Sequence, residues 1–188
     1  VASVSKGAMV ALLVRLFAPI DLNQQDALFF VFAGLAIASM VVGNVLALLQ
    51  SNIKRLLAYS SIGHMGYMLV AFLAGGNFAI SAVTFYLVAY TFTILGCFGV
   101  ISALSGQDRD ADTMDDFQGL YFRFPWLTGI FTVMLLSLAG IPLTAGFVGK
   151  FYIMTAGVKD GLWALIFFLV LSSGIGLFYY LRVIIVMY

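Results

Sequence analysis

Residues 138–152 read LAGIPLTAGFVGKFY, and this stretch decides how the rest of the chain is arranged. It separates two apolar runs, 126–137 and the run that starts near Gly161. Pro142 lacks a backbone N–H and clashes with the preceding helical turn, so a helix that enters this stretch must kink or break. An ionisable residue, Lys150, follows one to two turns later. Non-helical backbone beside an intramembrane charge is typical of transporter binding and coupling sites. The predicted break is carried by Gly140, Pro142 and Gly146.

Composition places the chain in a lipid bilayer. Of its 188 residues, 63% are hydrophobic and only 9% are charged, whereas a soluble domain carries about 25% charged residues. We therefore predict an all-α, polytopic transmembrane helix bundle. The lone cysteine, Cys97, excludes a disulfide within the chain and any CxxC metal motif. No nucleic-acid partner is expected.

Apolar runs of about 20 residues, the length that a bilayer requires, divide the chain. The sequence starts inside such a run, with no methionine or charged flank ahead of it. Residues 1–18 are accordingly predicted to be the end of a truncated transmembrane helix that stops at Pro19. Residues 26–188 are predicted to hold five further spans, one of them broken. These spans are expected at about 26–49, 53–74, 78–104, 125–157 and 162–188.

Three features outside the break give further expectations. The polar segment 105–124 is predicted to be a solvated loop, with residues 117–124 lying along the membrane interface as a short amphipathic piece. In the first of the five spans, small or amide side chains predict close helix packing. Near the end of the last span, two tyrosines and an arginine predict an interfacial belt. The packing residues of the span 26–49 are Gly34, Gly43 and Asn44. The residues of the predicted belt are Tyr179, Tyr180 and Arg182.

The distribution of basic residues predicts the orientation of the chain. With alternating spans, one side holds five basic residues and the opposite side holds two, so the first side is predicted to be cytoplasmic. The five are Lys54, Arg55, Arg109, Arg123 and Arg182, and the two are Arg15 and Lys159.

Two lysines are predicted to lie within the hydrocarbon core. Lys150 is separated from the turn at 158–161 by roughly 10 Å of helix, and Lys6 lies about 18 Å from Pro19. A lysine at such depth costs about 2.5–3.5 kcal/mol, and a low dielectric favours its neutral form, so it can exchange a proton near neutral pH. The chain has no glutamate, and its aspartates fall in or beside connections. The counter-charge must then be water, backbone carbonyls or acids elsewhere. A neutral, structural Lys6 is the alternative.

His64 is the third candidate for proton transfer. It lies near the middle of the span 53–74, and Ser60 and Tyr67 share its helix face at i−4 and i+3. Histidine titrates near neutral pH and suits a proton relay. A histidine satisfied by Ser60 is an equally good interpretation. A matching polar stripe on the next span predicts either a wet path or hydrogen bonds between helices. That stripe consists of Tyr86, Tyr90 and Thr93.

The sequence resembles the antiporter-like membrane subunits of respiratory complex I in three stretches. These are SVSKGA at 3–8, GNVLALLQSNIKRLLAYSSIGHMGYMLV at 43–70 and SLAGIPLTAGFVGKFY at 137–152. Within that family, they are most similar to the branch of bacterial subunit N and mitochondrial subunit 2. The resemblance implies two inverted five-helix repeats, of which 26–188 matches the second repeat, with its broken helix at 125–157.

The resemblance also implies roles for the buried charges. Lys6 matches the central lysine of the family's eighth helix, Lys150 matches the lysine associated with proton exit, and His64 matches a histidine on the polar axis between them. The glutamate–lysine pair of the first repeat has no counterpart in this sequence. The implied function is that of a proton-translocating subunit of NADH:quinone oxidoreductase, a translocase driven by distant quinone reduction.

Partners, cofactors and localisation follow from the same resemblance. The chain is expected to bind no redox cofactor or metal itself, because flavin, iron–sulfur clusters, NADH and quinone belong to partner subunits. Its expected partners are other membrane-arm subunits and the lipid bilayer. Its expected location is the bacterial inner membrane, or the mitochondrial inner membrane for an organelle homologue.

Three other functions remain open on sequence grounds. The chain can belong to a multisubunit cation/proton antiporter, to the membrane arm of an energy-converting hydrogenase, or to a structural spacer. A lysine at position 150 favours the N-type or L-type subunit over the M-type, which carries glutamate there. A spacer gives no reason for buried lysines.

Overall fold

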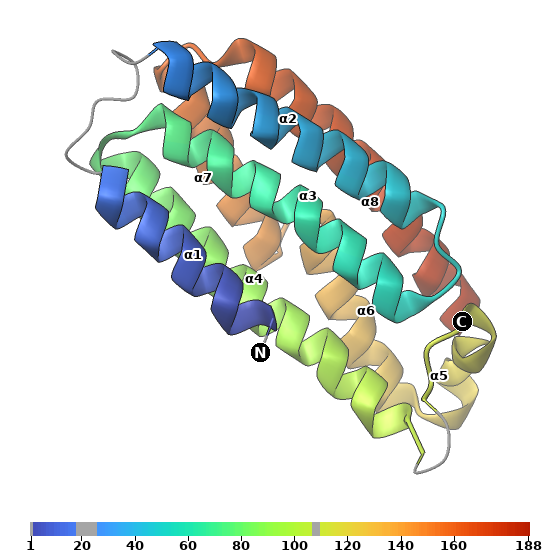
Figure 1. The fold of residues 1–188 in the computed structure, drawn as a ribbon. Coiled ribbons are helices and arrows are strands. Elements are labelled where there is room, and N and C mark those ends of the chain that lie inside the picture. Colours follow the sequence, from blue (N-terminus) through green and yellow to red (C-terminus); the bar gives the residue numbers. More distant parts are fainter. Residues whose placement is uncertain (1, 18–25, 107–109) are drawn as a thin grey trace.

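The computed structural model describes residues 2–17, 26–106 and 110–188, and these residues form a bundle of helices with no strand (Figure 1). The predicted all-α class is confirmed. The elements are α1 (Ala2–Phe17), α2 (Asp26–Leu48), α3 (Ile53–Ala74), α4 (Gly76–Leu104), η2 (Met114–Phe117), α5 (Leu120–Arg123), α6 (Pro125–Ala139), α7 (Ala145–Lys159) and α8 (Trp163–Met187).

Four helices are long and apolar enough to cross a bilayer, namely α2, α3, α4 and α8. Each agrees with a predicted span to within two residues at either end. The fourth predicted span is interrupted as expected, since α6 and α7 follow one another along the bundle with a break between them (Figure 1). Pro19 and the predicted connection at 20–25 lie outside the described residues.

Helix α3 occupies the centre of the bundle and packs against α2, α4, α7 and α8. Small residues bring α2 and α3 together. A Cβ added at Gly43 would lie 2.6 Å from the backbone nitrogen of Gly63, and one added at Gly66 would lie 2.8 Å from the Ala36 carbonyl oxygen. Among the described residues nothing lies within 4 Å of a Cβ added at Gly34, so the close packing predicted there is not found within this part of the chain.

The polar segment is attached to the start of α3 and is more ordered than the predicted solvated loop. Asn52 caps α3 by accepting a hydrogen bond from the Arg55 backbone N–H, and its Nδ2 donates to Asp112 at 2.6 Å. Backbone hydrogen bonds join Ile53 to Asp112 and Met114 to Ser51. Lys54 pairs with Asp110 at 2.5 Å. Asp108 and Arg109 lie outside the described residues.

The end of this segment, at η2 and α5, packs against α8 and α6 at one end of the bundle (Figure 1). Phe117 and Leu120 are buried, and the Phe117 ring packs on Phe131 at a centroid distance of 5.5 Å. Tyr121 and Phe122 remain exposed, so residues 117–124 have a buried and an exposed side, and their place along the membrane interface stays a prediction.

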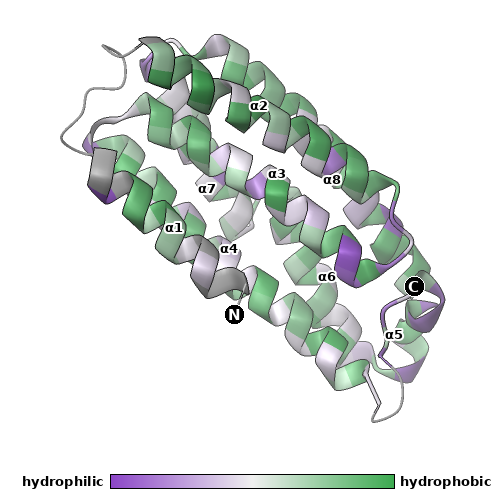
Figure 2. Cartoon of the chain, in the orientation of Figure 1, coloured by the Kyte–Doolittle hydropathy of each residue, from purple (hydrophilic) through white to green (hydrophobic). Residues whose placement is uncertain are grey.

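The predicted interfacial belt is wrong for both tyrosines of α8. Tyr179 and Tyr180 are each only 1% exposed. Hydrophobic residues cover the outer helices, while hydrophilic ribbon appears at mid-length of α3, inside the bundle (Figure 2). Buried polar side chains therefore gather around α3, where the candidate site is found.

Candidate functional site

The helix break has a defined local geometry. Gly140 ends α6 with φ 81°, a left-handed conformation that glycine adopts readily. Pro142 lies in the following turn, and Thr144 caps α7 by accepting a hydrogen bond from the Phe147 N–H. Five residues, 140–144, thus separate the two helices.

Gly146 allows the two halves of the broken helix to pack tightly. Its backbone N–H donates to Ser137 Oγ at 3.2 Å, and a Cβ at this position would overlap the Ser137 carbonyl. All three residues predicted to carry the break therefore lie within it or directly against it.

Lys150 is buried beside the break, with 4% of its surface exposed. Its Nζ donates to Leu138 O at 3.0 Å, to Ala139 O at 2.9 Å and to Ser173 Oγ at 2.9 Å. The two carbonyls belong to the last turn of α6, where no intrahelical partner is available and the helix dipole is negative. Among the three predicted sources of counter-charge, the structure thus supplies backbone carbonyls. Among the described residues, no ion pair involves Lys150.

The number of acceptors matches the protonated form of this lysine. An ammonium has three N–H donors and no lone pair. Lys150 has three acceptors, one for each N–H. A neutral amine has two N–H donors and one lone pair, so after loss of the proton it can donate to the two carbonyls and accept from the Ser173 hydroxyl.

His64 lies in a second part of the site and joins three helices. It is 3% exposed, its Nδ1 lies 2.5 Å from Tyr86 Oη on α4, and its Nε2 lies 3.2 Å from Tyr180 Oη on α8. A neutral imidazole has one donor and one acceptor nitrogen, so one tyrosine donates to the ring and the other accepts from it. Ser60 Oγ donates to the Leu57 carbonyl at 2.9 Å.

A small cavity connects the histidine with the helix break. Its volume is about 10 Å³, which is about the space of one water molecule. It opens between the His64 ring and Ser137, whose Oγ lies 3.4 Å from Thr93 Oγ1. The lining residues are His64, Tyr86, Tyr90, Thr93, Ser137, Leu138 and Gly146.

Tyr67 is the ring that contacts both ionisable side chains. The Lys150 ammonium lies 5.2 Å from the centroid of this ring, and the His64 ring lies 5.4 Å from it in an edge-to-face arrangement. Hydrogen bonds hold the phenol: Ser172 Oγ donates to Tyr67 Oη at 3.3 Å and Asn44 Nδ2 at 3.5 Å. The ring thus links two parts of the site that come from different helices.

A third polar group ties α2 and α8 to α3. Tyr179 Oη donates to Asn44 Oδ1 at 2.8 Å, and Asn44 Nδ2 donates to the Met40 carbonyl at 2.7 Å. Asn44 was expected to serve close helix packing and Tyr179 an interfacial belt, but their pairing was not predictable because the two residues are 135 positions apart. The same holds for Tyr180 and Ser173, which the sequence reasoning missed.

The predicted site residues are thus placed as follows. The structure brings together His64, Ser60, Tyr67, Tyr86 and Tyr90 around α3, and Lys150 joins them through Tyr67. Lys6 lies on α1, which packs against α4, and its side chain lies outside the described residues. Its predicted role stays a prediction.

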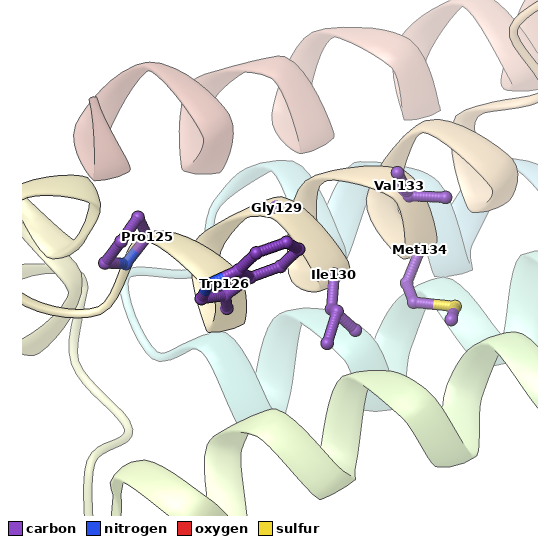
Figure 3. A pocket seen from close by; sticks show the side chains of 6 residues that line it. All are labelled: Pro125, Trp126, Gly129, Ile130, Val133 and Met134. Atoms are coloured by element: carbon purple, nitrogen blue, oxygen red, sulfur yellow. The ribbon is translucent and has the colours of Figure 1, made fainter.

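An apolar groove on the opposite end of α6 is separate from this site. It has a volume of about 560 Å³ and is lined by Pro125, Trp126, Gly129, Ile130, Val133 and Met134 (Figure 3). None of these lining residues is ionisable, so the groove offers no group for proton transfer.

Two relatives of known name match nearly the whole chain. It is 50% identical over 190 residues to NADH-quinone oxidoreductase subunit N of Methylococcus capsulatus, covering 99% of this chain and 38% of the relative. It is 50% identical over 189 residues to the subunit of the same name from Ectopseudomonas mendocina, covering 100% of this chain and 38% of the relative. The chain thus spans about two-fifths of the length of these relatives.

Solved structures share the fold. Respiratory complex I from Thermus thermophilus contains a chain with a TM-score of 0.75 and 35% identity, covering 84% of this chain and 36% of that chain. An archaeal membrane-bound sulfane sulfur reductase gives a TM-score of 0.80 at 26% identity, with 86% and 33% covered. The Mrp complex from a Dietzia species gives 0.83 at 24% identity, with 93% and 32% covered, which shows the fold alone.

A family model described as NADH:quinone oxidoreductase/Mrp antiporter, transmembrane region, matches residues 1–176. Together with the subunit N relatives, this match confirms the resemblance to antiporter-like complex I subunits. The chain belongs to the NADH:quinone oxidoreductase/Mrp antiporter transmembrane family.

Proposed function

We propose that this chain is part of a proton-translocating subunit N of NADH:quinone oxidoreductase, and that Lys150 is one of its proton-carrying groups. The observation that carries the proposal is the buried ammonium of Lys150, held by three acceptors at the break between α6 and α7. The 50% identity to two named subunit N relatives favours this enzyme.

The geometry around Lys150 supports a two-state mechanism. In the protonated state all three N–H groups are paired, and the negative end of α6 stabilises the charge. In the neutral state the amine can still donate to both carbonyls and can accept from the Ser173 hydroxyl, so what is lost is the attraction between the charge and the negative end of α6. Protonation of Lys150 would therefore strengthen its contact with the end of α6, and a distant reaction that moved the two halves of the broken helix apart would favour release of the proton.

His64 would lie on the proton path between Lys6, at its entry, and Lys150. Its two ring nitrogens meet Tyr86 and Tyr180, so a proton added to one nitrogen can be matched by loss of a proton from the other. The cavity between His64 and Ser137 has room for about one water, which would extend the path to the helix break. Lys6 would supply the entry side.

The remaining partners follow from this assignment. The chain would bind no redox cofactor, and NADH oxidation and quinone reduction would take place in other subunits of the same enzyme. Its neighbours would be other membrane-arm subunits and lipid. Its location would be the bacterial inner membrane.

A cation/proton antiporter or a related respiratory complex is the second candidate, because the Mrp and sulfane sulfur reductase chains share the fold. Purification of the full-length protein with an affinity tag separates these possibilities. We expect it to bring down flavin and iron–sulfur proteins that reduce quinone with NADH. An antiporter complex without flavin, or a complex with hydrogenase or sulfur reductase activity, would refute the assignment.

Lys150 itself is tested by Lys150→Ala in the complete enzyme, measured as quinone reductase turnover per assembled complex. We expect assembly to persist and turnover to fall, because pumping and turnover are coupled. The matched control is Lys159→Ala, which removes an exposed lysine from the last turn of the same helix. Wild-type turnover in Lys150→Ala would argue against a role in proton transfer.

A further inference from the structure

The ammonium of Lys150 has a neighbour besides its three hydrogen-bond acceptors. Those acceptors come from α6 and α8. The contact from α3 is made by the aromatic ring of Tyr67, whose centroid lies 5.2 Å from Nζ. A cation within about 6 Å of the face of an aromatic ring is attracted by the negative charge of that face. Because no ion pair involves Lys150 among the residues that the structure describes, this ring and the two carbonyls face the charge in place of a carboxylate.

The Tyr67 ring is held from several sides, so its face has a fixed direction. It is 2% exposed, and its hydroxyl accepts hydrogen bonds from two other helices. The donors are Ser172 Oγ at 3.3 Å and Asn44 Nδ2 at 3.5 Å. Two further rings pack on it at steep angles, His64 at 84° and Tyr86 at 72°. A ring whose rotamer is locked by packing and hydrogen bonds can in turn orient the side chain that it touches.

Burial makes this contact stronger than the same contact at the surface. The attraction between a cation and a ring grows when the cation is removed from water. Lys150 and Tyr67 are both buried. The same helix also offers a surface counterpart, because the Lys159 ammonium lies 4.1 Å from the centroid of the Phe78 ring and both residues are exposed.

We propose that Tyr67 is a positioning residue for Lys150, an inference that rests on the proposed function. Its ring holds Nζ beside the carbonyls of Leu138 and Ala139, and it attracts the lysine through charge only while the lysine carries a proton. The polar stripe in the sequence points to the hydroxyl of Tyr67, whereas the structure assigns the role to its ring. Without the ring, fewer enzymes would hold a protonated Lys150 at the helix break in each cycle, and proton pumping would fall.

The test changes the ring in steps in the complete, membrane-bound enzyme. Tyr67→Phe keeps the ring and removes the hydroxyl, and Tyr67→Leu removes the ring. In a third series, Tyr67 is replaced by phenylalanine analogues with one, two or three fluorine atoms. Fluorine leaves the size of the ring nearly unchanged but withdraws negative charge from its face, so this series separates charge from packing. Proton pumping and quinone reductase turnover are measured per assembled complex.

The matched control is Phe78→Leu, which removes the ring beside the exposed Lys159. It makes the same kind of change on a lysine of the same helix, outside the site. We expect pumping in this variant to stay within about twofold of the wild type, because a cation–π contact at the surface is weak.

We expect Tyr67→Leu to reduce proton pumping by about tenfold, because a buried cation–π contact shifts a population by a factor of this order. Tyr67→Phe should stay within about twofold of the wild type, because the ring remains. Its two former donors keep other acceptors, since Ser172 also donates to the Leu169 carbonyl and Asn44 to the Met40 carbonyl. Pumping in the fluorinated series should fall with each added fluorine.

Three results would overturn the role of the ring. The first is pumping in the fluorinated enzymes that equals that of Tyr67→Phe while Tyr67→Leu is defective, which would mean that the ring only fills space. The second is an equal loss in Tyr67→Phe and Tyr67→Leu, which would assign the role to the hydroxyl. The third is normal pumping in Tyr67→Leu while Lys150→Ala is defective. Normal pumping in Lys150→Ala would instead refute the proposed function itself.

Discussion

At the scale of single residues, the site needs glycine at positions 140 and 146, because a side chain at either position would collide with its neighbours. A Cβ on Gly140 would lie 2.9 Å from Lys150 Cδ, and one on Gly146 would overlap the Ser137 carbonyl. Both glycines therefore make room: the first for the lysine side chain, the second for the contact between α6 and α7. Without either one, Lys150 could not reach the end of α6 in the observed geometry.

Gly146→Ala should destabilise the enzyme, because the added methyl group must displace backbone of α6. Overpacking of a buried site typically costs about 1–3 kcal/mol, and backbone contact places this site at the upper end. The measurement is the amount and melting temperature of the assembled enzyme. Gly129→Ala on α6 is the control, since a Cβ there meets nothing within 4 Å. Equal melting temperatures for the two variants would contradict the tight contact at Gly146.

At the scale of elements, α3 is positioned from its first residue. Asn52 caps the helix and also binds Asp112, so one side chain joins the start of α3 to the polar segment. The short bridge between Asn52 and Thr113 reinforces this attachment. His64 lies three turns further along the same helix, and its depth in the bundle depends on where α3 begins.

Asn52→Ala should loosen the polar segment and lower the stability of the enzyme, because loss of a helix cap costs about 0.5–2 kcal/mol. The measurement is the rate of limited proteolysis within residues 105–124. Gln50→Ala is the matched control, since Gln50 Nε2 donates to the Leu46 carbonyl in the last turn of α2. Proteolysis at the same rate in both variants would show that the cap does not hold the segment.

The elements also show which parts of the site are readable from sequence. Pro142 and its glycines predict the break from local chemistry, and the depth of Lys150 follows from counting residues to the next turn. Tyr179 and Tyr180 were misjudged because aromatic residues near a span's end are typical of an interface. They precede the end of α8 by about two turns, or roughly 12 Å, and α8 turns them towards Asn44 and His64. These two pairings depend on how α8 is rotated about its own axis. A membrane span is apolar on all sides, so its hydrophobic pattern does not predict that rotation.

At the scale of the whole molecule, the connections between the helices gather at the two ends of the bundle (Figure 1). The α2–α3 turn and the polar segment lie at one end, where they bind each other through Lys54 and Asp110. The turn between α7 and α8 lies at the other end (Figure 1). The distribution of basic residues predicts that the first end is cytoplasmic.

Labelling of single cysteines tests this orientation. Gln118→Cys should react with a membrane-impermeant maleimide in inside-out vesicles, and Asp160→Cys should react in vesicles of the opposite orientation. Both positions are exposed, whereas the native Cys97 is buried and contributes little background. The reverse pattern of labelling would invert the predicted topology and make the α7–α8 end of the bundle the cytoplasmic one.

The central claim is that Lys150 carries protons across the membrane, and the number of protons translocated per two electrons tests it most directly. This ratio is measured in proteoliposomes containing the complete enzyme with Lys150→Ala, with Lys159→Ala in parallel. Loss of the only buried ammonium seen in the described part of the chain should lower the ratio, the rate of pumping, or both, while the control keeps wild-type values. A Lys150→Ala enzyme that assembles and pumps with the wild-type ratio at the wild-type rate would contradict the account.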